Sequence, residues 1–289
     1  MQNNITNLQK ILFDYSNIQE FDLSWYLYCI EDEVEISYND NILMPSSSIR
    51  KISILLSALS QARQLLLDFN KPIKINHTQV ETSDSSGCIQ FLHSGVNLTF
   101  KDLLTLMIIV SDNIATEKII NLIGLDTVNN YCREINLRGT FHEYAIPTAN
   151  ITRDSPIDKL NRTTAKDTGY LLKSILKGAN NSQYSKLIKC TNEDCMFALN
   201  ILSAQQDTSF FQPLLPIQAH IANKLGLGVR NCGDAGIIYF EEDPKFILVI
   251  LTDNLPLQSK IEIDGYAAAS KFFANFAKLI WEKIAMGHS

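Results

Sequence analysis

The first part of the chain changes from one hydrophobic spacing to another. Around residues 3–15, apolar side chains recur every three to four positions, which predicts an amphipathic helix. The segments SWYLYCI and EVEISYN that follow are rich in aromatic and β-branched residues, a composition typical of strands. The acidic residues 31–33 separate these two segments. We therefore expect a helix followed by two strands joined by a polar turn.

The middle of the chain has a helical pattern. From Ser47 onward, SIRKISILLSALSQARQLLL is apolar on one face and nearly continuous at its centre, which predicts a long buried helix whose first turn carries Ser48 and Lys51. Thr99 followed by Asp102 is a helix-capping pattern. Further helices are expected over residues 99–110, 113–123, 125–136 and 164–177. The middle of the chain is therefore predicted to be all helical.

A strand pattern returns after Pro213 and Pro216. Strands are expected over residues 218–225, 235–241 and 245–252, and a closing helix over 265–285. Asp243 and Pro244 are residues typical of a turn, and we place the turn between the last two strands there.

Strands at both ends that enclose a helical middle predict an α+β fold with one antiparallel sheet. Residues 1–289 then form a single unit. Residues 1–46 and 213–289 make its α/β part, in which helices flank the sheet, and residues 47–212 make an inserted, mainly helical part. We expect the chemistry in the cleft between the sheet and the helical part.

Composition narrows the classes of function. The 289 residues carry a formal net charge of −6, which argues against nucleic acid or an anionic membrane as the main partner. The apolar run LLTLMIIV stops at Ser111 and is shorter than the roughly 20 residues of a membrane span. The N-terminus lacks the pattern of a secretion signal. We therefore expect a cytoplasmic protein if the chain is complete, and a periplasmic or secreted one if a signal peptide was removed.

Metals and cofactors are not implied by the sequence. The six cysteines are too few and too scattered for a disulfide framework in a chain of this size, so we expect reduced thiols. The five histidines show no spacing typical of metal ligands, and no glycine-rich phosphate loop occurs.

One serine has a basic partner at helical spacing. A serine hydroxyl becomes a good nucleophile when a nearby base accepts its proton. Lys51 follows Ser48 by three positions, a spacing that places both on one face of a helix. Ser47 has the same relation to Arg50, which cannot act as a base. Taken alone, the pair of Ser48 and Lys51 is typical of an ordinary surface pair on a helix, because a Ser-x-x-Lys occurs by chance in most chains.

Two further polar segments interrupt apolar elements. Ser111, Asp112 and Asn113 separate two predicted helices, either as a helix cap or as a rigid loop beside the nucleophile. Lys224 and Gly226 lie on a predicted strand. The lysine there either points into the cleft or is an exposed edge residue, and the glycine permits close backbone approach. The order Ser-x-x-Lys, Ser-Asp-Asn and Lys-x-Gly is typical of β-lactamases and penicillin-binding proteins.

Over roughly residues 22–285, the chain resembles the class A β-lactamases and the related small D-alanyl-D-alanine peptidases. The stretches that carry the resemblance are YNDNILMPSSSIRKISIL, LTFKDLLTLMIIVSDNIATEKIINLIG, NRTTAKDTGYLL, ILSAQQDTSFFQPLLP and IANKLGLGVRNCGDAGIIY. The resemblance implies a β-lactamase-like fold and a penicillin-recognising serine hydrolase. Its partner would be a small-molecule carbonyl substrate, namely a β-lactam or an acyl amide or ester.

The resemblance also implies catalytic roles for four residues. Ser48 would attack the carbonyl carbon, and Lys51 would accept the proton of its hydroxyl. Ser111 would pass a proton to the leaving nitrogen. Lys224 would lie beside Ser111 and attract the carboxylate of the substrate.

Four positions are implied to bind the substrate. Asn113 would hold an amide side chain of the substrate, and the backbone N–H groups of Ser48 and Leu227 would bind the oxyanion next to Gly226. Leu225 stands where the family mostly has Thr or Ser, so a hydroxyl that helps to bind the substrate carboxylate is missing.

A second departure concerns the release of the acyl group. Class A β-lactamases hold a glutamate in the loop before the Thr-Thr segment, and AIPTANITRDSPIDKLNRTTAKD contains none. Weak candidates for the missing base are Asp154 and Asp158 in this loop and Glu143 just before it. The alternative is that these carboxylates belong to a solvated face of the loop. Arg230 either pairs with a substrate carboxylate or has a structural role. We expect slow deacylation of penicillins.

Three functions therefore compete. The first is a serine acyl-hydrolase that forms an acyl-enzyme on Ser48. The second is a non-catalytic or sensor-like binding protein of the same fold, and the third is a glutaminase-like amidase. A reporter β-lactam followed by intact-protein mass spectrometry separates turnover from a stable adduct and from no reaction.

Overall fold

The computed structural model describes residues 2–65, 67–76, 86–146 and 151–284. The chain begins with helix α1 (Gln2–Asn17) and the antiparallel strands β1 (Asp22–Cys29) and β2 (Val34–Tyr38). It ends with strands β7 (Ala219–Leu227), β8 (Cys232–Phe240) and β9 (Asp243–Asp253) and helix α9 (Gly265–Ile284). These strands form one antiparallel sheet in the order β2-β1-β9-β8-β7. The sheet thus joins the two ends of the chain, as predicted.

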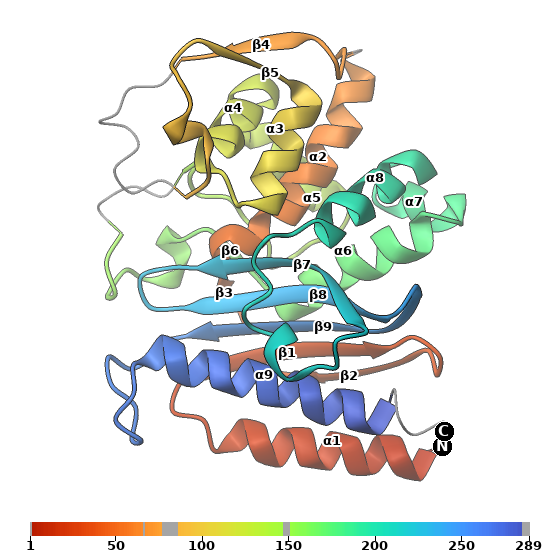
Figure 1. Cartoon of the computed structure of the whole chain (residues 1–289), viewed down its shortest axis with the longest axis vertical. Helices are drawn as coiled ribbons and strands as arrows, with labels where there is room; N and C mark the ends of the chain where they lie inside the picture. The colour runs from red at the N-terminus through yellow and green to blue at the C-terminus, as the bar shows by residue number, and fades with distance from the viewer. Residues whose placement is uncertain (1, 66, 77–85, 147–150, 285–289) are drawn as a thin grey trace.

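Three layers make up the fold (Figure 1). Helices α1 and α9 cover one face of the sheet, and the helical part of the chain covers the other. Side chains of β1 alternate between these faces: Trp25 and Leu27 pack toward α1 and α9, whereas Tyr26 and Tyr28 pack toward the helical part. Burial on both faces explains why β1 is an almost unbroken apolar run. The architecture is the α+β arrangement that the sequence predicts, with one antiparallel sheet flanked by helices.

The middle of the chain is mainly helical. Its helices are α2 (Lys51–Gln64), α3 (Phe100–Ile109), α4 (Asn113–Ile123), α5 (Leu125–Glu134), α6 (Ala165–Gly178), α7 (Ser182–Leu187) and α8 (Asn192–Ser203). Short 3₁₀ turns are η1 (Ser47–Arg50), η3 (Ile89–Phe91), η4 (Ile157–Lys159) and η5 (Gln212–Leu214). Helix α2 lies at the centre, where residues such as Ile54, Leu55 and Leu56 are fully buried.

The expectation of an all-helical middle is wrong in one respect. Strand β4 (Pro72–Ile75) pairs with β5 (Val96–Thr99), and β3 (Met44–Pro45) pairs with β6 (Arg162–Thr163). The strands of each pair are short and lie far apart in the sequence. Their pairing therefore leaves no periodic pattern of apolar residues along the chain.

Two local predictions also differ from the structure. Ser48 lies in the 3₁₀ turn η1, and α2 begins only at Lys51. A 3₁₀ turn has three residues per turn, so both side chains still share one face. The turn between β8 and β9 consists of residues 241–242, and Asp243 and Pro244 already belong to β9. Pro244 is tolerated because it lies at the start of the strand, where the register with β8 shifts.

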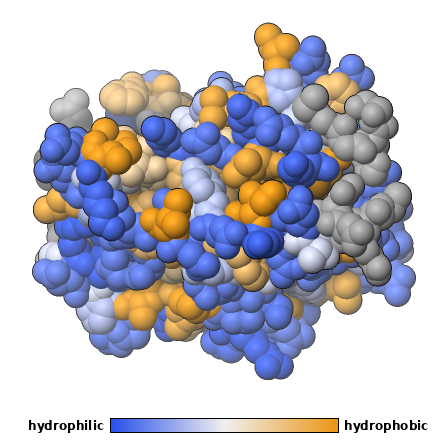
Figure 2. Space-filling model, turned by 90° about the horizontal axis from the view of Figure 1, so that it is seen from below, coloured by the Kyte–Doolittle hydropathy of each residue, from blue (hydrophilic) through white to orange (hydrophobic). Residues whose placement is uncertain are grey.

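The surface below α1 and α9 is mostly polar. Figure 2 shows hydrophobic areas on this face that are small and separated by hydrophilic residues. Isolated apolar side chains of this kind are normal on a folded protein. Within the described residues, none of the helices combines the length and apolar character that crossing a membrane requires.

Candidate active site

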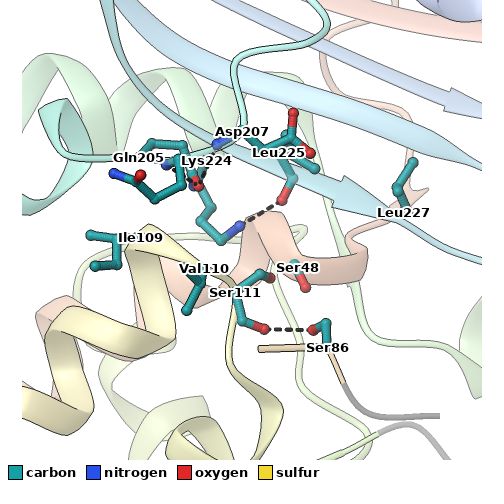
Figure 3. Close-up of a pocket in the computed structure, with 11 residues that line it drawn as sticks. Ser48, Ser86, Ile109, Val110, Ser111, Gln205, Asp207, Lys224, Leu225 and Leu227 are labelled. Carbon is teal, nitrogen blue, oxygen red and sulfur yellow. Dashed lines mark hydrogen bonds between the residues drawn. The ribbon is translucent and has the colours of Figure 1, made fainter. Parts of the chain in front are cut away.

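A cavity of about 360 Å³ lies between β7, η1 and the end of α3 (Figure 3). It is lined by Ser48, Ser86, Ile109, Val110, Ser111, Gln205, Gln206, Asp207, Lys224, Leu225 and Leu227. Segments from five separate parts of the sequence therefore meet at one place. Five of these residues are among those that the sequence singled out, namely Ser48, Ser111, Lys224, Leu225 and Leu227.

The turn η1 decides which serine faces the cavity. Ser46 is fully buried, and Ser47 has a left-handed backbone with a φ of 43°. Such a conformation is unfavourable for a residue other than glycine. Ser47 is stabilised there because Asn231 Nδ2 donates to its Oγ over 2.9 Å. Of the three serines, Ser48 alone lines the cavity.

Gly226 lets β7 approach this turn. A Cβ atom at position 226 would lie 2.9 Å from the backbone N of Ser48 and 3.0 Å from Cβ of Ser47. These distances are shorter than van der Waals contact, so a larger residue would force η1 away from the strand. Gly226 is therefore required by close packing rather than by its own backbone angles.

Lys51 is almost completely buried and fully hydrogen-bonded. Its Nζ donates to the carbonyl oxygen of Ser111 over 2.6 Å, to Oγ of Ser111 over 3.1 Å and to Oδ1 of Asn113 over 2.8 Å. Among the described residues, Ser48 is not one of its partners. Burial, followed by the positive charges of Lys224 and Arg50, lowers the pKa of Lys51 well below its usual range.

The Ser111–Asn113 segment acts both as a helix cap and as a wall of the site. Asp112 caps α4, since its Oδ1 accepts from Ala115 N over 2.9 Å. Its Oδ2 accepts from the N–H groups of Cys88 and Ile89, each over 2.8 Å. Ser111 has a left-handed φ of 55°, which directs its carbonyl and hydroxyl toward Lys51. The two alternative interpretations of this motif are therefore compatible.

Lys224 lies beneath the cavity with no exposed surface. Its Nζ donates to the carbonyl oxygen of Leu225 over 2.9 Å (Figure 3). Burial lowers the pKa of Lys224 to about 8, against the opposing effect of Asp234 and Asp207. The side chain of Leu225 is buried in the core on the α9 side of the sheet, whereas Leu227 is 57% exposed at the mouth.

The acidic residues of the loop before β6 do not reach the cavity. Asp154 and Asp158 are exposed, and neither lines the pocket. Glu143 forms an ion pair with Arg162 over 3.8 Å. Arg230 has the structural role, because its guanidinium pairs with Asp253 over 2.7 and 2.9 Å.

One wall of the cavity received no role from the sequence. Gln205, Gln206 and Asp207 follow α8 and line the pocket. Gln205 Nε2 donates to the carbonyl oxygen of Ile108 over 2.9 Å, and Gln206 N donates to that of Ile109 over 2.9 Å. In the sequence, the available signal for this wall was that the three polar residues stand between an apolar helix and a strand. Only the fold shows that it lies beside Lys224.

The described residues contain no group of three or more His, Cys, Asp or Glu side chains that could hold a metal ion. All six cysteines are free thiols, and five of them are buried.

Comparisons with known proteins concern the family and the fold of the chain. Residues 5–284 match the Beta-lactamase enzyme family. A search of curated protein sequences finds no significant match.

Three solved structures illustrate the similarity of fold. A β-lactamase from Sphaerobacter thermophilus has a TM-score of 0.78 and 18% identity, with 97% of each chain covered. The extended-spectrum β-lactamase TLA-1 has a TM-score of 0.79 and 17% identity, covering 96% of this chain and 98% of its own. A mutant of PBP-A, solved as an acyl-enzyme complex with penicillin G, has a TM-score of 0.77 and 18% identity, covering 98% of this chain and 97% of its own.

Proposed function

The chain belongs to the beta-lactamase enzyme family, and we propose that it is a serine acyl-hydrolase that forms an acyl-enzyme on Ser48. The observation that carries this proposal is the position of Ser48 in the cavity, one helical turn from a buried lysine whose pKa is lowered. A lysine whose pKa is lowered by burial gives up its proton more readily than an exposed one, and its neutral form can accept a proton.

The acylation step follows from the contacts around Lys51. Oγ of Ser48 forms a bond to the carbonyl carbon of the substrate, and its proton passes to Lys51 Nζ. Ser111 Oγ, 3.1 Å from Lys51 Nζ, then supplies a proton to the leaving nitrogen or oxygen as the scissile bond breaks, and takes up the proton from Lys51. The products are the acyl-serine and a free amine or alcohol. A hydrogen bond between Lys51 and Ser48 would form when substrate enters, since catalytic hydrogen bonds often reach their full geometry only in the complex.

Substrate binding is assigned to the neighbouring groups. The backbone N–H groups of Ser48 and Leu227 are proposed to bind the oxyanion, and the close packing of Gly226 on Ser48 keeps the two segments together. Asn113 accepts from Lys51 through Oδ1. This contact orients its amide and leaves Nδ2 to donate to a carbonyl group of the substrate.

Release of the acyl group is proposed to be slow for penicillins. The carboxylates of Asp154 and Asp158 are exposed outside the cavity, and Glu143 is paired with Arg162. None of the three is placed to activate a water molecule at Ser48. This observation also favours the second candidate function, a sensor-like protein that is acylated without turnover. A glutaminase-like amidase is the third.

Labelling with a fluorophosphonate tests the nucleophile. We expect one adduct on the peptide that contains Ser48, and none in the variant Ser48→Ala. Ser46→Ala is a matched control, because Ser46 Oγ is buried without a hydrogen-bond partner and its removal leaves the turn intact. Labelling that persists in Ser48→Ala would reject the proposal.

Nitrocefin then separates the candidate functions. Turnover indicates a β-lactamase, and a stable adduct on Ser48 indicates a peptidase-like or sensor-like protein. No reaction with nitrocefin, together with fluorophosphonate labelling, indicates a hydrolase of other amides or esters.

A further inference from the structure

The segment of residues 86–89 holds the motif of residues 111–113 in place. Ser86 Oγ donates to the carbonyl oxygen of Ser111 over 2.6 Å, and the carbonyl oxygen of Ser86 accepts from the backbone N–H of Asn113 over 3.0 Å. Ser86 therefore contacts the motif on both sides of Asp112, whose carboxylate accepts from two further N–H groups of the same segment.

Gly87 lets this segment lie directly against the motif. Its φ is 107°, in the region that favours glycine. A Cβ atom at position 87 would lie 2.2 Å from Oδ2 and 2.4 Å from Cα of Asp112. These distances are far below van der Waals contact, so the backbone of residue 87 fits there only without a side chain. This close packing fixes the position of Ser86, the residue before it.

The carbonyl group of Ser111 is held from two sides. Lys51 Nζ donates to it over 2.6 Å from the buried interior, and Ser86 Oγ donates to it over 2.6 Å from the cavity, which Ser86 lines (Figure 3). A carbonyl oxygen has two lone pairs, and these two contacts use both. The φ of Ser111 is 55°, which is unfavourable for a residue other than glycine. Ser86 therefore helps to keep the backbone of Ser111 in this conformation.

The side chain of Ser111 depends on that backbone. Its Oγ lies 3.1 Å from Lys51 Nζ, near the long end of the range for a hydrogen bond. In the proposed function this hydroxyl gives a proton to the leaving group and takes one up from Lys51. A displacement of the backbone by about 1 Å would break the contact with Lys51, and a misplacement of this size can cost roughly 10²-fold in rate.

We propose that Ser86 is a positioning residue for proton transfer to the leaving group: its hydroxyl holds the backbone of Ser111 so that Ser111 Oγ stays between Lys51 and the scissile bond. This inference rests on the proposed function and adds a residue to its mechanism. Ser86 is exposed, so in the absence of its hydroxyl a water molecule can donate to the Ser111 carbonyl. Water satisfies the carbonyl without fixing its position. The contribution of Ser86 is therefore expected in the reaction rate and not in the stability of the fold.

Two acetate esters with different leaving groups test this inference. Acylation joins the acetyl carbon to Ser48 Oγ and breaks the bond to the leaving oxygen. The para-nitrophenolate ion leaves as a stable anion, whereas trifluoroethoxide is strongly basic and needs the proton from Ser111. The measured quantity is kcat/KM, which reports acylation whichever step limits turnover, and each variant is compared with the original chain on the same ester. We expect Ser86→Ala to lower kcat/KM by about tenfold or more for the trifluoroethyl ester and by less than about twofold for the nitrophenyl ester.

Further variants show whether the hydroxyl acts through Ser111. Ser86→Thr keeps a hydroxyl and should retain most of the rate with the trifluoroethyl ester. In a chain that already carries Ser111→Ala, Ser86→Ala should cause no further loss, because the effects of two residues that act as a unit are not additive. Ser182→Ala is the matched control, since Ser182 is an exposed serine on α7 that does not line the cavity. Urea unfolding of Ser86→Ala should match that of the original chain.

Four outcomes would overturn the inference. The first is an equal loss with both esters, or no loss with either, in Ser86→Ala. The second is a Ser86→Thr chain that is as slow as Ser86→Ala, and the third is a further loss caused by Ser86→Ala in the Ser111→Ala chain. The fourth is the absence of reaction with the trifluoroethyl ester in a chain whose Ser48 reacts with a fluorophosphonate, because Ser111 then does not assist a basic leaving group. A chain whose Ser48 does not react with the fluorophosphonate would instead reject the proposed function itself.

Discussion

Arg50 donates from Nη1 to Nδ1 of His142 over 3.1 Å in the core of the protein. A guanidinium group only donates, so Nδ1 is unprotonated. Ser53 Oγ donates to the carbonyl of Arg50 over 2.8 Å and lies 3.0 Å from Nε2 of His142. The proton of the imidazole is therefore on Nε2 and is donated to Ser53. Burial, and then the charge of Arg50, lower the pKa of His142 well below its usual range, consistent with a neutral ring.

Because His142 is neutral, it does not balance the positive charge of Arg50, and this charge lies behind the site. The other acceptors of Arg50 are the carbonyl groups of Tyr144 and Ala145. Among the described residues, no carboxylate accepts a hydrogen bond from Arg50. Arg50 precedes Lys51 in the sequence and is one of two cations that lower the pKa of Lys51. Through its hydrogen bonds, Arg50 thus connects the segment after His142 to the turn that carries Ser48.

Arg50→Met is the first prediction. Loss of the guanidinium leaves buried carbonyl groups without donors, at a cost of about 1–3 kcal/mol in the free energy of unfolding. It also removes a cation from beside Lys51, so the pKa of Lys51 rises and the acidic limb of the acylation rate moves to higher pH. Urea unfolding and a pH profile of fluorophosphonate labelling measure the two effects. Arg50→Lys, which keeps the charge, should move the acidic limb less; an equal shift would contradict the electrostatic explanation.

Lys51→Ala should slow acylation of Ser48 by roughly 10²–10⁴-fold, the usual contribution of a general base. Single-turnover labelling measures this rate. Unfolding is measured in parallel, because Lys51 also holds Ser111 and Asn113. Lys271→Ala on the exposed side of α9 is the control. A wild-type labelling rate in Lys51→Ala would remove Lys51 from the mechanism.

The pH dependence of stability should contain a contribution from Asp234. This carboxyl group is fully buried on β8; its Oδ1 accepts from Asn223 Nδ2 over 2.9 Å, and its Oδ2 has no partner. Burial raises the pKa of Asp234 from 3.8 to about 7. The folded state therefore retains a proton that the unfolded state loses as the pH rises from about 4 to about 7. Stability from this group is complete below pH 4 and is lost through that window, by at most about 4 kcal/mol.

Asp234→Asn should remove this pH dependence, since an amide keeps the acceptor for Asn223 and does not ionise. We expect the variant to gain stability relative to the original chain between pH 5 and pH 8 in urea unfolding. Asp243→Asn, at an exposed position, should show no such gain. If the difference in the free energy of unfolding between Asp234→Asn and the original chain stayed constant with pH, Asp234 would be ionised throughout.

Benzylpenicillin should leave a penicilloyl adduct on Ser48 for minutes, because no carboxylate of the 151–160 loop lines the cavity. Intact-protein mass spectrometry detects this adduct, one ligand heavier than the free chain. Asp154→Asn and Asp158→Asn should behave in the same way as the original chain. Rapid turnover without an adduct, lost in one of these variants, would identify that aspartate as the hidden base.

The sequence by itself determined the strands of the main sheet and the local spacing of the motifs. Ser48 and Lys51 share one face because they are three positions apart in a helical segment. The helix cap at Thr99 consists of hydrogen bonds with Asp102, three positions later. Such relations involve neighbours along the chain, so periodicity and residue type are sufficient to predict them. The sheet built from both ends of the chain was also predictable, because a helical middle separates two groups of strands.

Only the tertiary structure decided what surrounds those motifs. Ser48 faces the cavity because Asn231 holds Ser47 and Gly226 packs on the turn. Likewise, Arg230 is paired with Asp253, and Asp207 is brought beside Lys224. These contacts join residues that are distant in sequence, and each depends on the packing of whole elements rather than on any local pattern. The surroundings of the nucleophile are for this reason a property of the fold.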